Sequence, residues 1–280
     1  MDRSAARGEG PDLAGLFPGA APAESPGRFR LRRSGDWLVG QAAAPAADEL
    51  EEAARGLYRE LLETAAGWHL CRIWNFVPDI NGEGPGGLER YRIFCRARSE
   101  EFERGFGPGF RDRLPAGSAV GAEAGELTVA FAASRARPEH RENPRQLPAY
   151  DYPPDYGPRP PSFCRATVVR GAAGYVFVSG TSAIVGHRSV APGDSRSQLE
   201  CTLENLETIS EQCGLGPDLA AGRARARHFT VYLRRPEERA ALEPVLRQRL
   251  LRPGDAVRYC RADICRAELN IEIEATIGGA

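Results

Sequence analysis

Residues 175–186 read YVFVSGTSAIVG, and residues 270–277 read NIEIEATI. The first stretch begins with Tyr, Val and Phe, which are typical of strands, and then turns at Gly180 between hydroxyl-bearing residues. The second stretch alternates polar and apolar side chains, which predicts a strand with one buried face. These stretches lie near the two ends of the second half of the chain, so the elements between them decide its fold.

Those intervening residues alternate between strand and helix patterns. A helix is predicted over residues 194–213, where leucines recur on one face and Asp194 or Ser195 can cap the N-terminus. The other predicted elements are, in chain order, strands over 166–170, 175–179 and 228–233, a helix over 236–251, and strands over 256–262 and 269–277. The order β-β-α-β-α-β-β predicts an α+β unit with helices packed on one face of a mixed sheet.

The first half of the chain repeats part of this order. The predicted elements are a helix from Asp48 to just before Gly67, a strand over 69–77, a helix over 88–104 and a strand over 127–133. Because this succession matches part of the second half, we expect two related domains that face each other.

The predicted organisation has four parts. Residues 1–36 are rich in Gly, Ala, Pro and Arg and are expected to form a poorly ordered tail, with an edge strand near 29–31 or just beyond, at 37–39. The other three parts are a shortened N-terminal domain (37–137), a connecting segment (138–162) and a C-terminal domain (163–280).

Residues 134–162 contain eight prolines and three tyrosines. This composition fits a linker between domains. It equally fits an ordered wall for an anionic ligand, because tyrosine and arginine alternate there with rigid proline. Composition leaves both interpretations open.

The charge balance excludes several classes of function. The chain has 37 basic and 38 acidic residues and a net charge of −1, so the footprint of a nucleic-acid or anionic-membrane binder is absent. Every basic residue is arginine, which excludes a lysine Schiff base and a phosphate-loop lysine. The sequence shows neither a membrane-spanning apolar run nor a secretory signal, so we expect a cytoplasmic protein.

The seven cysteines form no CxxC pair, and no histidine stands at a zinc-ligand spacing from a cysteine pair. We therefore expect reduced thiols and no metal site. Cys265 is the one cysteine for which a further role is predicted below.

Five separated motifs resemble one enzyme family. They are RIWNFVPDING (72–82), GLERYRIFCRAR (87–98), NPRQLPAYDYPPDYGPRPPSFCRA (143–166), VSGTSAIVGHRS (178–189) and ADICRAELNIEIE (262–274). Together they resemble the chorismatases, from about Trp68 to the C-terminus. The second half alone also resembles the RidA (YjgF) fold, in which a Val-Glu-Ile-Glu strand stands where this chain has NIEIE.

The resemblance implies two RidA-like (chorismate mutase-like) halves with the active site between them. The implied reaction removes the enolpyruvyl group of chorismate as pyruvate, without a metal or organic cofactor. The family forms 3-hydroxybenzoate, a mixture of 3- and 4-hydroxybenzoate, or a dihydroxycyclohexadiene carboxylate. We expect 3-hydroxybenzoate, made for secondary metabolism, from a monomer or homotrimer.

Glu272 corresponds to the catalytic glutamate of that family. Cleavage of a vinyl ether requires a proton on its terminal carbon, and a carboxyl group whose pKa is raised by burial can supply one. The alternation of Glu272 with Ile271 and Ile273 puts it on one face of a strand. Without the resemblance, a solvated strand face would be the preferred interpretation.

Chorismate carries two carboxylates, which in a lysine-free chain must be bound by arginine or backbone N–H groups. The predicted binding residues are Arg159, Arg165, Tyr150, Tyr152, Tyr156, Gly180, Thr181 and Ser182. For either arginine the competing interpretation is a surface charge. For the Gly180–Ser182 turn it is a tight strand connection.

Cys265 is predicted to influence the product. In the resemblance its position holds cysteine in hydroxybenzoate-forming enzymes and alanine in the hydrolytic type. A thiol or thiolate there can assist an intramolecular route, whereas alanine leaves room for water. A buried, inert thiol is the alternative.

Two other functions stay open at this point. One is hydrolysis of chorismate to the dihydrodiol. The other is a RidA-like protein that binds a small carboxylate without catalysis, or that acts as an enamine or imine deaminase. Arg258 lies near the position of the carboxylate-binding arginine of such deaminases, but the surrounding motif differs, which weakens that interpretation.

Overall fold

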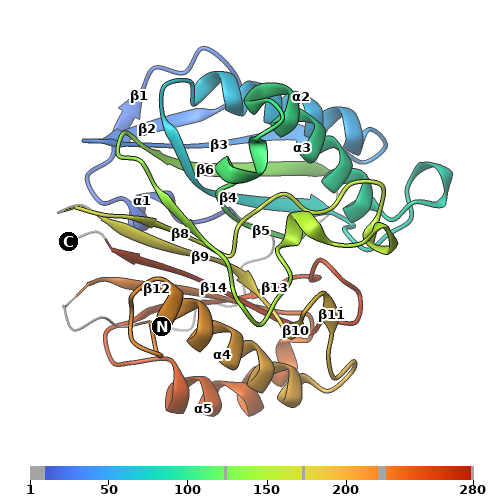
Figure 1. Ribbon diagram of the computed structural model, residues 1–280, viewed down its shortest axis with the longest axis vertical. Helices are drawn as coiled ribbons and strands as arrows, with labels where there is room; N and C mark the ends of the chain where they lie inside the picture. The colour runs from blue at the N-terminus through green and yellow to red at the C-terminus, as the bar shows by residue number, and fades with distance from the viewer. Residues whose placement is uncertain (1–9, 123–124, 172–173, 220–224, 279–280) are drawn as a thin grey trace.

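The computed structural model describes residues 10–122, 125–171, 174–219 and 225–278. These residues form two six-stranded mixed β-sheets that face each other, and helices cover the outer side of each sheet (Figure 1). The mixed α+β class is therefore confirmed. None of the helices in these ranges is both long and apolar enough to cross a lipid bilayer.

The first sheet has the order β1-β2-β3-β6-β4-β5, in which only the β4–β5 pair is parallel. Its strands are β1 (Ala21–Ala23), β2 (Arg30–Ser34), β3 (Trp37–Pro45), β4 (His69–Pro78), β5 (Ala116–Ala122) and β6 (Glu126–Ser134). Helices α2 (Leu50–Thr64) and α3 (Arg90–Phe106) pack on its outer face, and a short α1 (Leu13–Leu16) precedes β1.

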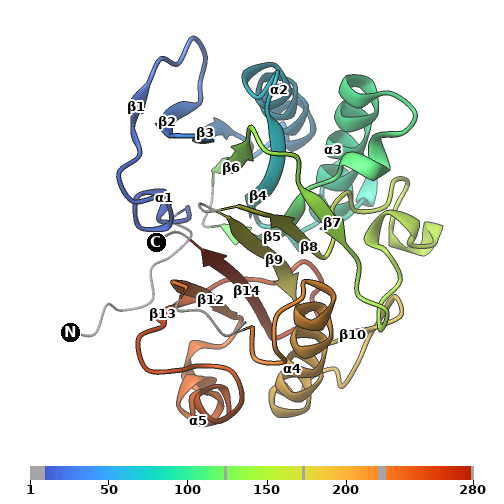
Figure 2. The ribbon, with the colours of Figure 1, turned by 60° about the vertical axis from the view of Figure 1, so that its left-hand side comes forward.

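The second sheet has the order β13-β12-β14-β9-β8-β7, again with one parallel pair, β12–β13. Its strands are β7 (Glu139–Arg141), β8 (Ala166–Val169), β9 (Tyr175–Thr181), β12 (Arg227–Leu233), β13 (Ala256–Arg261) and β14 (Ile271–Gly278). Helices α4 (Ser195–Gln212) and α5 (Arg239–Arg249) cover it (Figure 2). A two-stranded ribbon, β10 (Ile184–Val185) and β11 (Arg188–Ser189), follows β9.

The two sheets repeat one topology. Read from β5 to β1, the first sheet matches the second read from β13 to β7, strand for strand. The expectation of two related halves is thereby confirmed, while the exact domain boundaries stay a prediction. The remaining elements are single 3₁₀ turns at Pro85–Gly87, Phe110–Arg113, Ala149–Asp151, Pro154–Tyr156 and Pro236–Glu238.

Strand β14 explains how charged residues come to lie between the sheets. Ile271, Ile273 and Ala275 pack in the hydrophobic cluster under α4 and α5. Since alternate side chains of a strand point to opposite faces, Glu272 and Glu274 point toward the first sheet. They are only 3% and 5% exposed, so the interpretation as a solvated strand face is wrong.

The N-terminal segment differs from the prediction of a poorly ordered tail. Residues 1–9 lie outside the described ranges, but residues 10–36 contain α1, β1 and β2. Phe17 is 2% exposed and packs against Trp37 and Tyr175, with ring centroids 5.4 and 5.0 Å apart. Contacts with distant residues, rather than local propensity, order this segment.

Candidate active site

A cavity of about 550 Å³ lies between the two halves. Its wall is built by residues distant in sequence: the loop before α3, strand β5, the proline-rich segment, the turn after β9, the loop before β14, and β14 itself. Seven of the predicted site residues line it, namely Glu272, Cys265, Arg165, Tyr152, Tyr156, Gly180 and Ser182. The proline-rich segment is therefore a wall of this cavity and not only a linker.

Three predicted binding residues do not line the cavity. Arg159 is paired with Glu103 at 2.7 Å, and both side chains are partly exposed. Tyr150 lines a different cavity, and the Thr181 hydroxyl donates a hydrogen bond to the carbonyl of Ser179 at 2.9 Å. We correct the prediction for these three side chains, because their polar groups are directed elsewhere.

Glu272 is buried at the floor of the cavity. Its Oε1 has no hydrogen-bond partner among the described residues, and its Oε2 lies 3.4 Å from Oγ of Ser182. Burial raises the pKa of Glu272 to about 8, and the negative charge of Glu274 adds to this; Arg72, Ser182 and Arg165 act in the opposite direction. At neutral pH the side chain is therefore a carboxylic acid.

The neighbouring Glu274 is held in a network that spans both sheets. It accepts hydrogen bonds from Arg72 at 2.5 Å, Ser118 at 2.8 Å, and Trp74 and Tyr232 at 3.1 Å each. Arg72 is 1% exposed, so this is a buried ion pair whose charges are compensated locally. The two carboxyl groups thus have different surroundings, one paired and one protonated.

Gly180 leaves the space that the Glu272 carboxyl group occupies. A Cβ atom at position 180 would lie 2.0 Å from Oε1 of Glu272 and 2.6 Å from its Cδ. A side chain at this position would push the carboxyl group away. The sequence indicated only a turn that permits close approach, and the structure shows which group approaches.

Arg165 is one of two buried arginines that line the cavity; it is 5% exposed and Arg98 is 2% exposed. Arg165 donates hydrogen bonds to the Tyr152 hydroxyl at 2.8 Å and to the carbonyl of Leu147 at 3.1 Å, while its Nε has no partner among the described residues. Its guanidinium group also lies 5.1 Å from the ring of Phe163. An unpartnered donor at a cavity wall is suited to bind an anion.

Sequence reasoning missed several further polar residues of the wall. Arg266 lies over the Tyr156 ring at 4.3 Å and donates to the carbonyl of His187 at 2.9 Å. Arg92, Arg98 and Ser118 also line the cavity. Arg92, Arg98 and Arg266 stand inside motifs quoted above, so their presence in those motifs was the available signal.

Cys265 lines the cavity as a thiol. Burial raises its pKa to about 12, and the nearby Glu272 contributes in the same direction. With this pKa, Cys265 is a thiol and not a thiolate at neutral pH.

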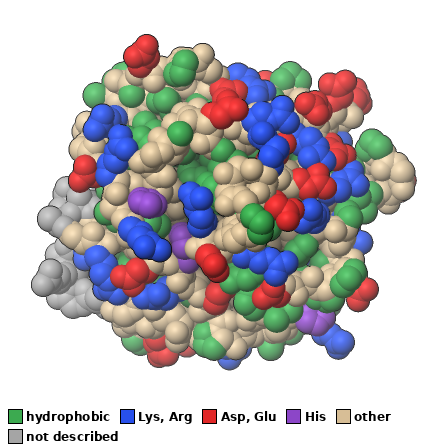
Figure 3. Space-filling view, turned by 45° about the horizontal axis from the view of Figure 1, so that its top comes forward, with side chains coloured by type: hydrophobic (Ala, Val, Ile, Leu, Met, Phe, Trp, Pro, Cys, Tyr) green, Lys and Arg blue, Asp and Glu red, His purple; other side chains and the backbone are tan. Residues whose placement is uncertain are grey.

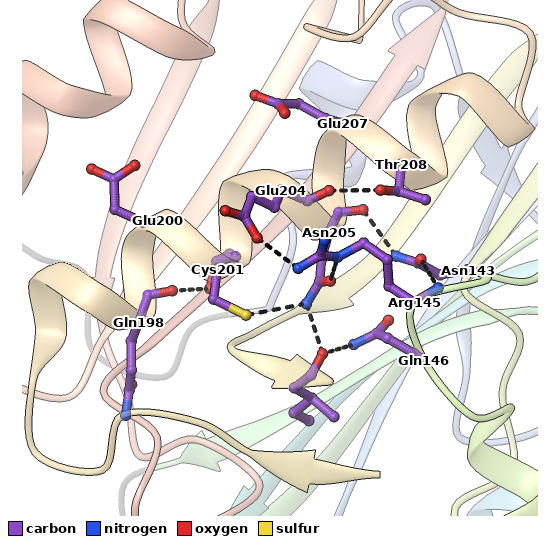
Figure 4. Close-up of polar contacts among 12 residues, drawn as sticks. Asn143, Arg145, Gln146, Gln198, Glu200, Cys201, Glu204, Asn205, Glu207 and Thr208 are labelled. Carbon is purple, nitrogen blue, oxygen red and sulfur yellow. Dashed lines mark hydrogen bonds and ion pairs between the residues drawn. The ribbon is translucent and has the colours of Figure 1, made fainter. Parts of the chain in front are cut away.

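Helix α4 holds two of the loops that form the wall, and Figure 4 shows Asn205 on this helix beside the segment that carries Asn143, Arg145 and Gln146. The Asn205 amide donates to the carbonyls of Ser182 and Ile184, at 3.0 and 2.9 Å. Gln198 donates to the carbonyl of Glu268 at 2.8 Å and accepts from the backbone N–H of Asn270 at 2.7 Å. The helix pattern in the sequence predicted only the apolar stripe, whereas these buried amides fix the turn after β9 and the loop before β14.

Comparison with known proteins agrees with this arrangement. Residues 18–133 match the family model described as chorismatase FkbO/Hyg5-like, N-terminal. A 3-hydroxybenzoate synthase from Streptomyces hygroscopicus is 36% identical over 87% of this chain and 74% of its own length. A chorismatase from Streptomyces rapamycinicus is 37% identical over 96% of this chain and 80% of its own length. The chain belongs to the chorismatase family.

A chorismatase of known crystal structure has the same fold. It matches this chain with a TM-score of 0.82 and 32% identity, over 92% of this chain and 80% of the other. The resemblance inferred from the five motifs is thereby confirmed. The family match also begins at residue 18, within the segment that the sequence suggested to be a tail.

Proposed function

We propose that this protein is a chorismatase that cleaves the enolpyruvyl ether of chorismate to pyruvate and 3-hydroxybenzoate. The observation that carries the proposal is the protonated, buried Glu272 on the floor of a cavity that Arg165 also lines. Membership of a family that includes a 3-hydroxybenzoate synthase supports the product.

Glu272 is the proposed general acid. Transfer of its proton to the terminal methylene carbon converts the vinyl ether to an oxocarbenium-like centre, as in glycoside cleavage. The hydroxyl of Ser182 donates to the carbonyl of Ile271 at 2.9 Å and also lies within donating distance of Oε2 of Glu272, at 3.4 Å. This contact orients the acid before the substrate arrives.

The release of pyruvate and the formation of the aromatic acid use only atoms that chorismate already contains. The ring 4-hydroxyl attacks the ring carbon that carries the ether oxygen, the bond between that carbon and the ether oxygen breaks, and the oxygen leaves as the keto oxygen of pyruvate. The hydroxyl proton returns to the Glu272 carboxylate, and an epoxide forms. Opening of the epoxide with loss of a ring proton yields the phenol, so neither water nor an oxidant is consumed. Hydrolysis to the dihydrodiol, in contrast, adds one water.

The two substrate carboxylates need separate cations. We assign one to Arg165, whose Nε is unpartnered, and the other to Arg266, which lies beside Tyr156. Tyr152 contacts Arg165, and Tyr156 contacts Arg266. These rings orient the guanidinium groups, because a guanidinium group packs favourably on an aromatic face.

The direct test is incubation with chorismate, with pyruvate detected through lactate dehydrogenase and the ring product separated by chromatography. We expect pyruvate and 3-hydroxybenzoate in equal amounts. If the dihydrodiol is the main product, the enzyme hydrolyses chorismate and does not use the intramolecular route. A rate no higher than that of spontaneous decay would exclude chorismatase activity.

The pH dependence of turnover follows from Glu272. Its acid form predominates below a pKa of about 8, so kcat should be constant at lower pH and fall as the pH rises through that value. The measurement is pyruvate release in stopped samples between about pH 6 and about pH 10. A rate that stays constant throughout this range would assign the proton transfer to another group.

Replacing Cys265 by alanine should change the product rather than the rate of ether cleavage. The thiol fills space beside Glu272, and its removal gives water access to the reacting carbon. We expect pyruvate release to continue while the fraction of 3-hydroxybenzoate falls in favour of the dihydrodiol, as measured by chromatography. Cys95→Ala, at another buried thiol outside the cavity lining, is the control. An unchanged product ratio in Cys265→Ala would show that the residue does not direct the outcome.

A further inference from the structure

A second cavity, of about 580 Å³, has no lining residue in common with the first. Trp68, Phe106 and Tyr150 contribute aromatic walls, and three arginines, two histidines, Asp112, Glu142 and Cys164 contribute polar or ionisable groups. On the face shown in Figure 3, histidine side chains lie close to arginine side chains around a hollow. Neither the proposed reaction nor the family comparison assigns a role to this cavity.

The cations of the second cavity outnumber its anions. Arg113 lies over the Phe106 ring at 3.9 Å, and Arg111 pairs with Asp151 at 3.0 Å in an exposed position. Arg137 has no ion-pair partner among the residues that the structure describes. Because Arg111 is already paired, the cations that can attract a small anion are Arg113 and Arg137, beside the acidic Asp112.

Glu142 is the unusual group inside this cavity. Both of its carboxyl oxygens are buried, and neither has a hydrogen-bond partner of good geometry among the described residues. Burial raises the pKa of Glu142 to about 7, and Asp151 adds to this, while Arg165 and the Tyr150 hydroxyl act in the opposite direction. Because its contacts with the Tyr150 hydroxyl and the Arg165 backbone are poorly aligned, this buried carboxyl group is suited to hydrogen bonding with a ligand.

His140 does not neutralise Glu142. Burial lowers the pKa of His140 to about 4, helped by the nearby His69 and Arg141, so its ring is neutral at physiological pH. In the described part of the chain, no group of three or more His, Cys, Asp or Glu side chains is arranged to hold a metal ion. With His140 neutral, the lining arginines are the groups that can bind an anion.

We propose that the second cavity binds a planar aromatic carboxylate. The ligand ring packs beside Trp68 and Phe106, whose ring faces carry Arg135 and Arg113 at 3.9 Å each. Arg137 and Arg113 bind the carboxylate, and Glu142 hydrogen-bonds a ring substituent. The cationic and aromatic character is observed in the cavity itself. The choice of a hydroxybenzoate as the natural ligand rests on the proposed function, because that is the product class of the reaction.

The two cavities lie on opposite sides of one short segment. Phe163 and Arg165 line the candidate active site, whereas Cys164 between them lines the second cavity. A ligand in the second cavity therefore lies beside Cys164, which precedes Arg165 in the chain. We expect a bound aromatic acid to alter substrate binding without occupying the active site.

The test uses benzoate, which carries the ring and the carboxylate but no enolpyruvyl group. Trp37 and Trp74 are 4% and 1% exposed, whereas Trp68 is only partly buried at the second cavity, so its fluorescence reports on this site. We expect saturable quenching by benzoate in the wild type and its loss in Trp68→Phe, in which calorimetry still detects binding. In Arg137→Gln the dissociation constant should rise about tenfold or more, because a charged hydrogen bond is lost.

Arg196→Gln is the matched control, since Arg196 is an exposed arginine on α4 outside both cavities. It should bind benzoate like the wild type, and Arg137→Gln should release pyruvate from chorismate at the normal rate in the absence of added acid. Equal affinities of the wild type and Arg137→Gln, or no saturable binding, would overturn the second site. Neither result bears on chorismate cleavage, which is measured separately as pyruvate.

Discussion

Replacing Glu272 by glutamine is expected to lower chorismate turnover by about 10²–10⁴-fold, the usual cost of losing a general acid. The amide has the same size and fits beside Gly180, but it has no carboxylic proton to transfer to the methylene carbon. The effect should appear in kcat, measured as pyruvate release, because binding of the substrate carboxylates is assigned to Arg165 and Arg266 and not to Glu272.

Folding of Glu272→Gln should be normal. The wild-type carboxyl group has a raised pKa, so the folded state binds more protons than the unfolded state between the ordinary glutamate value and about 8. Wild-type stability therefore falls as the pH rises through this window, whereas a neutral amide avoids that loss. Chemical denaturation at neutral and alkaline pH should show the variant to be at least as stable.

Glu268→Gln provides the matched control, because Glu268 also lines the cavity but is exposed. It should retain turnover within a few-fold of the wild type. If Glu272→Gln did the same, the proton would have to come from another residue. Glu274 would then be tested next, although its ion pair with Arg72 argues against a role as an acid.

Gly180→Ala should have the second largest effect, a loss of turnover of about 10²-fold. The added Cβ atom would overlap the Glu272 carboxyl group, with only 2.0 Å to Oε1, so the carboxyl group must move. Because the displaced atoms are at the end of a flexible side chain, the fold should survive. A shift of about 1 Å in a reacting group is enough for such a loss.

Gly109→Ala controls for glycine replacement itself, because Gly109 has an ordinary negative φ of −86° and no atom near its absent Cβ. We expect it to match the wild type in melting temperature and in kcat. Gly180→Ala should match only in melting temperature, and the alkaline limb of its pH profile should shift as the surroundings of Glu272 change. An unaltered kcat in Gly180→Ala would show that catalysis does not depend on the observed position of Glu272.

Sequence patterns alone determined most elements of both halves. Periodicity located α2, α3, α4, α5 and the strands with strong β-formers, because those residues specify local structure through their own side chains. It missed β5, whose residues AGSAVGA are small and have weak strand preference. That strand is held by its parallel pairing with β4, a contact that the local sequence does not reveal.

The proline-rich segment was only partly predictable. It has no periodicity, so nothing local distinguishes Tyr150, which lines the second cavity, from Tyr152 and Tyr156, which line the first. Likewise, Arg159 and Arg165 look alike in the sequence, and only folding places one on the surface and the other inside.

The family resemblance singled out Glu272 from the sequence, but the sequence could not show that it is an acid at neutral pH. The pattern NIEIEATI is equally compatible with a strand whose polar face meets water. The face becomes buried because the first sheet packs onto it, bringing Arg72 to Glu274 across 202 residues of chain. Desolvation and the neighbouring negative charge then raise the pKa of Glu272, and both arise only from contacts between segments that are far apart in sequence.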